Sequence, residues 1–242
     1  MFDTHSRVRC PGPRGAIAWL VVVAAGLVHL GAYAADDGGV CGSPYVTKVG
    51  PHDYRVEQGP RKNIVETYHF TPLVEALVKG ESGPLGADIG YTLQAFPNHH
   101  RALVAMMNLG TKLKTPQPPG ASFTVECYFN RALRFRGDDT IVRILYAKFL
   151  TLGGRRDEAR KQLKIADEFA ADNGFTHYNI GLTYLEMNDY PDALAQAHRA
   201  LELGFTRPEL KAQLITAGKW VEPTVAAPAA TDTAASQAPP QK

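Results

Sequence analysis

Small and apolar residues recur every 34 positions in the stretch 140–204. When the sequence is shifted by this spacing, four pairs of small or apolar residues coincide: Ala147 with Gly181, Leu150 with Tyr184, Ala159 with Ala193, and Ala166 with Ala200. A fixed period of this size is typical of helical hairpins that stack in a row and bury their apolar faces against their neighbours. The small residues let two helices approach closely. The pattern predicts two consecutive hairpins, 140–173 and 174–207.

The second of these hairpins resembles the tetratricopeptide repeat (TPR) family. The residues that fill the family's signature slots are Ile180-Gly181-Leu182-Thr183-Tyr184, Tyr190, Ala193 and Ala200-Leu201. The resemblance implies an all-α solenoid in which the first helices of successive hairpins line a concave groove. A repeat scaffold implies a way of binding and leaves the ligand open.

The apolar pattern continues on both sides of this core. Before it we expect a degenerate hairpin with a short first helix opening at Thr71-Pro72, and then a hairpin with helices near 99–112 and 122–135. After it, Leu210, Leu214 and Ile215 lie on one side of a capping helix. The predicted fold is therefore all-α, a TPR-type solenoid of about four hairpins, the first degenerate, and a C-terminal cap. The predicted TPR region is 67–221, with units near 66–99, 100–139, 140–173 and 174–207 and the cap at 208–221.

The connection Thr115–Gly120 is longer than a TPR turn and holds three prolines, which make it stiff. Two interpretations stay open for it. It is either a tolerated surface insertion or a peptide-like handle for a partner.

The N-terminus has the three-part layout of a secretory signal. Three arginines precede an uncharged run at 16–30, and Ala32-Tyr33-Ala34 offers a small-x-small cleavage pattern. We expect a signal peptide at 1–34 that is cleaved on export to the periplasm of a Gram-negative bacterium. The alternative is an uncut anchor, although the apolar run is short for a membrane span.

The two ends of the exported chain lack helix signals. Gly and Pro punctuate 35–66, which predicts an irregular N-terminal arm across the first helices. Ala, Pro, Thr, Ser and Gln dominate 222–242, and such a composition predicts a disordered tail.

Cysteine usage agrees with export. Cys10 leaves with the signal, so Cys41 and Cys127 remain as a pair in an oxidising compartment. We expect them to form a disulfide that ties the arm to a helix of the second hairpin; the alternative is two unpaired cysteines.

The charge balance excludes a global attraction to nucleic acid. The chain carries 26 Lys and Arg against 24 Asp and Glu, and without residues 1–34 each sign counts 23. A neutral chain has no net pull toward phosphates or anionic lipid. Contact with a membrane is expected only through a partner or an uncleaved signal anchor.

No constellation of residues predicts catalysis, a metal site or a cofactor. His99 and His100 are adjacent, so on a helix they point about 100° apart and do not ligate one metal as an i, i+4 pair does. We expect one of them to cover the turn at the start of a helix and the other to meet solvent. The protein is therefore expected not to be an enzyme.

The remaining function is binding. Carrying the family's concave groove over to this sequence gives nine candidate residues, three from each of the last three hairpins: Arg101, Val104, Asn108, Ile144, Lys148, Thr151, Tyr178, Asn179 and Leu182. This surface suits a peptide with apolar residues and one carboxylate. The alternative is that several of these side chains contact the chain's own arm or tail.

Further stretches resemble an exported bacterial TPR family to which no activity is attached. They are Phe70-Thr71-Pro72-Leu73-Val74-Glu75, Asp88-Ile89-Gly90-Tyr91-Thr92-Leu93 with Phe96-Pro97-Asn98-His99-His100, and Ala217-Gly218-Lys219-Trp220. The first hypothesis is a non-catalytic periplasmic scaffold that holds a protein or peptide partner in its groove, in envelope assembly, secretion or polysaccharide export. The second is an accessory subunit of a membrane complex that packs through its outer surface, with its groove filled by its own arm.

Overall fold

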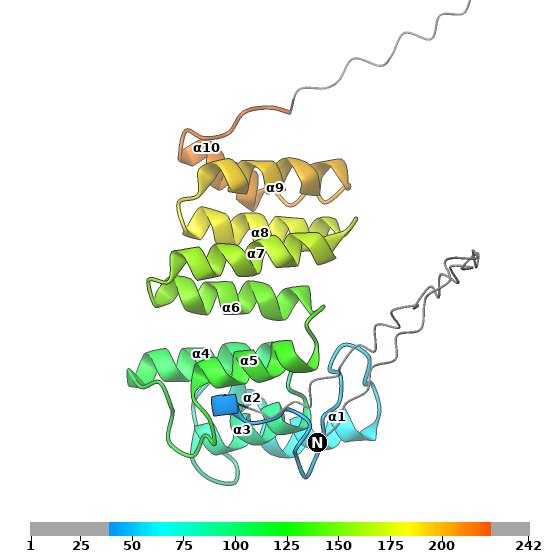
Figure 1. Cartoon of the computed structure of the whole chain (residues 1–242), viewed down its shortest axis with the longest axis vertical. Helices are drawn as coiled ribbons and strands as arrows, with labels where there is room; N and C mark the ends of the chain where they lie inside the picture. The colour runs from blue at the N-terminus through cyan, green and yellow to red at the C-terminus, as the bar shows by residue number, and fades with distance from the viewer. Residues whose placement is uncertain (1–38, 224–242) are drawn as a thin grey trace, which may run out of the picture. The chain divides into compact units, whose positions relative to one another are not determined.

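The structure is a computed structural model, and it describes residues 39–223 (Figure 1). The predicted signal peptide lies outside the described residues, and so does the predicted tail beyond residue 223. Within 39–223 every regular element is a helix, which confirms the all-α expectation. The elements are η1 (Gly39–Cys41), α1 (Pro60–His69), α2 (Pro72–Glu75), α3 (Leu85–Ala95), α4 (His100–Leu113), α5 (Val125–Phe135), α6 (Thr140–Leu152), α7 (Arg156–Ala170), α8 (Gly174–Glu186), α9 (Tyr190–Glu202) and α10 (Glu209–Thr216).

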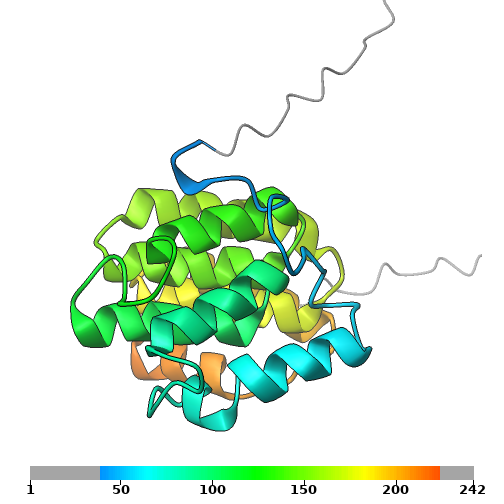
Figure 2. The same ribbon diagram turned by 90° about the horizontal axis from the view of Figure 1, so that it is seen from below.

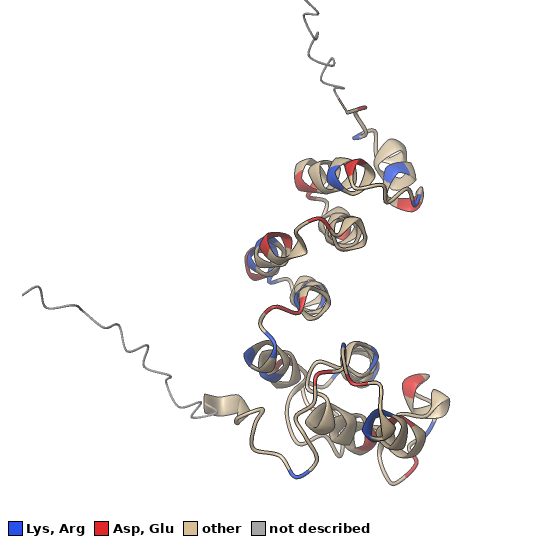
Figure 3. Cartoon of the chain, turned by 90° about the vertical axis from the view of Figure 1, so that its right-hand side faces the viewer, with Lys and Arg blue, Asp and Glu red and all other residues tan. Residues whose placement is uncertain are grey.

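The helices from α4 onward stack in two layers. The most extensive contacts join α6 to α7 and α8 to α9, and both pairs are connected by short turns. One layer is continuous, because α4 contacts α6, α6 contacts α8 and α8 contacts α10. Figure 3 views these helices nearly end-on and shows α4, α6 and α8 on the inner side of a curve, with α5, α7 and α9 on its outer side. The acidic and basic residues of α7 cluster on that outer layer, whereas α8 is almost free of charge.

Side-chain caps fix where several helices begin. The side chains of Thr71, His99, Thr124, Asp139 and Asn173 each accept a hydrogen bond from the backbone N–H three residues further on. Such caps satisfy N–H groups that have no partner inside the helix. The cap at Thr71 confirms the expected opening of a short helix at Thr71-Pro72.

The small residues of the 34-residue period lie where helices cross. Ala147, Ala166 and Ala200 are buried. A Cβ added to Gly181 would lie 2.5 Å from Cδ2 of Leu210 and 3.2 Å from Cβ of Gln196. No side chain larger than hydrogen therefore fits between α8, α9 and α10 without displacing Leu210.

The structure differs from the predicted boundaries near the N-terminus. The predicted irregular arm of 35–66 ends early, because α1 begins at Pro60, a residue well suited to a first helical turn. Figure 2 shows α1 lying at the end of the stack. The helix after Thr71 has only four residues, and Leu77 just beyond it takes φ 56°, a left-handed conformation that does not continue a helix.

The N-terminal arm (residues 42–59) is fastened to the outer layer and to the end of α3. Cys41 and Cys127 form a disulfide with Cα atoms 5.0 Å apart, as the sequence predicts. Arg131 of α5 donates hydrogen bonds to the carbonyl oxygens of Cys41 and Ser43, at 3.2 and 2.8 Å. Further along, the ring of Tyr54 stacks on His99 with centroids 3.9 Å apart. The arm is thus a packed part of the fold.

The proline-rich connection between α4 and α5 packs against α3. Pro118 is buried, and a Cβ on Gly86 would lie 2.5 Å from the carbonyl oxygen of Pro119. The backbone N–H of Val125 donates a hydrogen bond to the carbonyl oxygen of Pro116 at 2.8 Å, which fixes the start of α5. These contacts favour the surface insertion over the peptide-like handle.

Candidate functional site

A hollow of about 350 Å³ opens on the inner layer between α4, α6 and α8. We call it the α4–α8 hollow. The residues that line it come from all three helices and are mostly apolar: Val104, Met107, Ile141, Ile144, Leu145, Lys148, Phe175, Thr176 and Asn179. Phe175 is 44% exposed, a large apolar surface for a ring at the start of a helix. An exposed apolar concavity of this kind is typical of a binding surface.

A second hollow of about 280 Å³ lies one helix closer to the N-terminus, between α2, α4 and α6. We call it the α2–α6 hollow. It is lined by Glu75, His100, Arg101, Val104, Ala105, Asn108, Ile141 and Leu145. Its lining is therefore more polar than that of the α4–α8 hollow.

The two hollows adjoin each other. Val104, Ile141 and Leu145 line both of them and form a ridge between them. We call the two hollows and this ridge the inner groove. None of the residues that line it belongs to the N-terminal arm, so the described part of the arm does not fill it.

Each hollow contains a residue that takes part in an ion pair. In the α2–α6 hollow Nε of Arg101 donates to Oε1 of Glu75 at 2.7 Å, and the hydrogen bonds between these two side chains hold the pKa of the Glu75 carboxyl below its usual range. In the α4–α8 hollow Nζ of Lys148 lies 2.8 Å from Oε1 of Glu186, which does not line the hollow. Both pairs are partly exposed, and exposed pairs contribute at most about 1 kcal/mol.

Six of the nine predicted groove residues line the inner groove. They are Arg101, Val104, Asn108, Ile144, Lys148 and Asn179.

The other three do not line it. Thr151 donates its hydroxyl hydrogen bond to the carbonyl oxygen of Ala147, and Leu182 packs against the core. Tyr178 is only 5% exposed, because Phe205 after α9 and Glu209 of α10 cover it. Burial, reinforced by the hydrogen bond to Glu209, raises the pKa of Tyr178.

The sequence-based list omits three apolar residues that are central to the groove: Ile141, Leu145 and Phe175. The sequence does indicate two of these residues, through their position in the helix. Ile141 and Phe175 are each the second residue of a hairpin's first helix, as Arg101 is in α4. Applying the helical position of Arg101 to every hairpin finds both of them.

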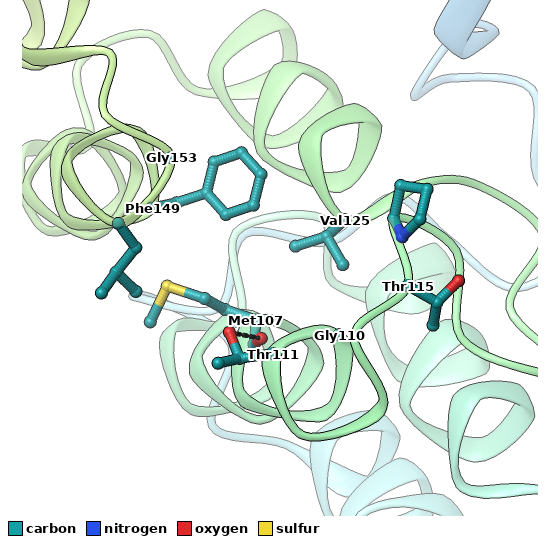
Figure 4. Close-up of a pocket in the computed structure, with 9 residues that line it drawn as sticks. Met107, Gly110, Thr111, Thr115, Val125, Phe149 and Gly153 are labelled. Carbon is teal, nitrogen blue, oxygen red and sulfur yellow. Dashed lines mark hydrogen bonds between the residues drawn. The ribbon is translucent and has the colours of Figure 1, made fainter.

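A third hollow of about 300 Å³ lies at the ends of α4 and α6, beside the proline-rich connection (Figure 4). Met107, Val125 and Phe149 point into it, and Pro116 and Leu152 also line it. The hydroxyl of Thr111 is occupied by a hydrogen bond to the carbonyl oxygen of Met107 at 3.0 Å. Met107 also lines the α4–α8 hollow, so this residue separates the two spaces.

The adjacent histidines have structural roles. Nδ1 of His99 accepts the N–H of Ala102 at 3.1 Å, and its Nε2 lies 3.1 Å from Oε1 of Glu66. Burial lowers the pKa of His99 to about 3, so the ring is neutral at pH 7 and Nε2 donates to the carboxylate. This ring covers the helix start, as expected of one of the two histidines.

The second histidine is mostly buried, against expectation. Nε2 of His100 lies 2.9 Å from the buried carboxylate of Asp139, which also accepts from Asn98 and from the N–H of Val142. Burial raises the pKa of Asp139, but these hydrogen bonds outweigh it and the net pKa lies below its usual range. The start of α4 is thereby joined to the start of α6.

One further group of side chains superficially resembles a nucleophilic triad. Nδ1 of His69 lies 3.2 Å from Oδ1 of the buried Asp88, and the hydroxyl of Ser82 donates to the same carboxylate. In a serine nucleophile the imidazole must lie between the hydroxyl and the carboxylate. Here both groups bind the carboxylate directly, so the group holds the 80–84 loop onto α3.

Two searches of residues 39–223 give negative findings. No group of His, Cys, Asp or Glu side chains there is arranged to hold a metal ion. No helix in that range is both long and apolar enough to cross a membrane.

Comparison of the chain with protein-family models, curated proteins and solved structures finds no match. The inner groove is thus the candidate site that the geometry itself provides.

Proposed function

We propose that the chain is a TPR-type solenoid that binds a protein or peptide partner in its inner groove. The 34-residue period, the small residues at the helix crossings and the continuous contact of α4, α6, α8 and α10 support this arrangement. Because the first helices of the hairpins form the inner side of the curve, their exposed residues face a common space.

The observation that carries the function is the pair of hollows joined by a shared ridge. An apolar concavity of about 350 Å³ adjoins one of about 280 Å³, and charged side chains are among the residues that line them. Such a surface buries apolar side chains of a partner and excludes water from the centre, which is where binding energy concentrates. The function we propose is a non-catalytic scaffold.

We place this scaffold in the periplasm, in envelope assembly, secretion or polysaccharide export. The N-terminal layout of 1–34 supports export, and a disulfide between Cys41 and Cys127 is compatible with an oxidising compartment.

The test is capture of partners from envelope extract by the wild-type chain and two matched variants. Ile141→Glu places a charge on the ridge, at the second residue of α6, where an acidic side chain suits the helix dipole. Lys164→Glu places the same side chain on the exposed surface of α7.

We expect Ile141→Glu to lose a partner that the wild type and Lys164→Glu both retain, with thermal unfolding of all three unchanged within a few degrees. Loss with Lys164→Glu alone would instead assign the contact to the outer surface, as in an accessory subunit.

A further inference from the structure

We propose that the partner enters the inner groove as an α-helix and inserts two bulky apolar side chains, seven residues apart, one into each hollow. An acidic residue of that helix lies beside Lys148. This inference rests on the proposed function and adds the conformation and chemistry of the ligand.

The spacing of the hollows carries the conformational part. The inner helices contact their neighbours directly, and helices in such contact have axes about 8–10 Å apart. The α4–α8 hollow is shifted along the stack by one inner helix relative to the α2–α6 hollow. Their centres are therefore separated by about 9 Å, one helix spacing.

A helix matches this spacing and an extended strand does not. Residues i and i+7 of a helix are about 10.5 Å apart along the axis and share one face. Same-face residues of a strand are about 6.6 or 13 Å apart, and residues three apart point to opposite faces. A strand that fills one hollow thus places its next inward side chain on the ridge or beyond the second hollow.

The lining of the groove carries the chemical part. The ridge residues Val104, Ile141 and Leu145 offer no hydrogen-bonding side chain, so the partner needs an apolar face there. A helix satisfies its own backbone groups, whereas a strand would bring unpaired N–H and C=O groups onto this apolar ridge.

Charge places the acidic residue of the helix. In the α2–α6 hollow the charges of Arg101 and Glu75 cancel, and they bind each other. Of the residues that line the α4–α8 hollow, Lys148 is the one with a charged side chain. Its present partner Glu186 lies outside that lining and is 52% exposed, so a ligand carboxylate can replace it. The acidic residue of the helix therefore lies next to the apolar residue that enters the α4–α8 hollow.

The test is selection of peptides by display on the purified chain. Two libraries of 16-residue peptides are used: one in a helix-favouring Ala, Glu, Lys and Gln background, the other in an extended background rich in Thr, Val and Pro. Binders that also bind Ile141→Glu are removed. Phe175→Glu, which changes only the α4–α8 hollow, is a second variant for measuring affinity in case Ile141→Glu unfolds.

We expect groove-dependent binders from the helical library, with bulky apolar residues seven apart and an acidic residue at one end. Moving the second apolar residue to a spacing of five should weaken binding at least tenfold. Lys148→Glu should weaken binding of the peptide with the acidic residue at least tenfold. It should not weaken binding of the same peptide with Gln in place of the acidic residue.

Groove-dependent binders from the extended library, at any spacing of their apolar residues, would overturn the helical ligand and leave the proposed function standing. An absence of any binder that distinguishes the wild type from both variants would contradict the proposed function as well.

Discussion

The phenol of Tyr178 donates a hydrogen bond to the carboxylate of Glu209, with 3.1 Å between the oxygens. The ring of the same tyrosine lies 5.0 Å from that of Phe205. Tyr178 lies on the first helix of its hairpin, at the position that lines the groove in α4 and α6. In α8 this position is covered by Phe205 and Glu209. The inner groove therefore ends at the first turns of α8.

Replacement of Tyr178 should test the cap and leave the groove intact. Tyr178→Ala removes a buried ring, which costs about 3 kcal/mol in the free energy of unfolding. Tyr178→Phe loses a hydrogen bond to an exposed carboxylate and should cost less than about 1 kcal/mol. Urea unfolding measures both, and partner capture should be unchanged for Tyr178→Phe. Loss of capture by that variant would place the hydroxyl in the binding site.

The disulfide should stabilise the fold by fastening the arm. Cys41 and Cys127 are 86 residues apart in sequence, so the loop that they close is long. Removing both cysteines as Cys41→Ala and Cys127→Ala should lower the free energy of unfolding by about 2–4 kcal/mol, because the unfolded chain gains freedom. It should also expose residues 42–59 to proteolysis. Two free thiols in the denatured, unreduced protein would contradict the pairing.

Stability should fall as the pH drops from 7 to 5, because of His99. Its pKa is about 3 in the folded chain against 6.5 in a model peptide, so the unfolded state binds a proton that the folded state excludes. This contribution is fully present above pH 6.5 and decreases by about 2 kcal/mol by pH 5.

The matched control for this pH dependence is His99→Asn, which keeps a side chain suited to the cap position but does not titrate. At pH 7 the free energy of unfolding of this variant should be lower than that of the wild type. Its decrease from pH 7 to pH 5 should be smaller than that of the wild type by about 2 kcal/mol. An unchanged pH dependence in this variant would exclude His99 as the source.

Gly181 should accept no larger side chain. Its Cβ position is 2.5 Å from Cδ2 of the fully buried Leu210, so Gly181→Leu must displace α10. Overpacking of this kind costs about 1–3 kcal/mol. Trp220 packs against the same core and reports the displacement by fluorescence. The control is Ala212→Leu, at an exposed position on α10. It should leave the Trp220 fluorescence spectrum and the free energy of unfolding unchanged.

Local and periodic features of the fold were predictable from the sequence. The coincidence of Ala147 with Gly181 and of Ala166 with Ala200 located two hairpins, because close packing at a crossing restricts side-chain size. The helix opening at Thr71-Pro72 was predictable because it depends on residues close in sequence, with the N–H of Val74 donating to the hydroxyl of Thr71. The cysteine pairing followed from the expectation of export, which leaves an even count of two cysteines.

Features that depend on distant segments were not predictable in this way. Helix α1 has a single buried residue, Val65, so it shows no apolar stripe in the sequence. Tyr178 was assigned to the groove because nothing in its own helix reveals that Glu209 and Phe205 cover it. One of the two adjacent histidines was expected to meet solvent. His100 instead binds Asp139, which lies 39 residues away in sequence and so gives no local signal.

The most direct measurement of the central claim is photo-cross-linking in the cells that produce the protein, with the photoreactive residue at position 141 or at position 164. The groove account predicts a discrete cross-linked partner from position 141, on the ridge between the hollows, and none from position 164 on α7. A partner cross-linked from position 164 and absent from position 141 would contradict it.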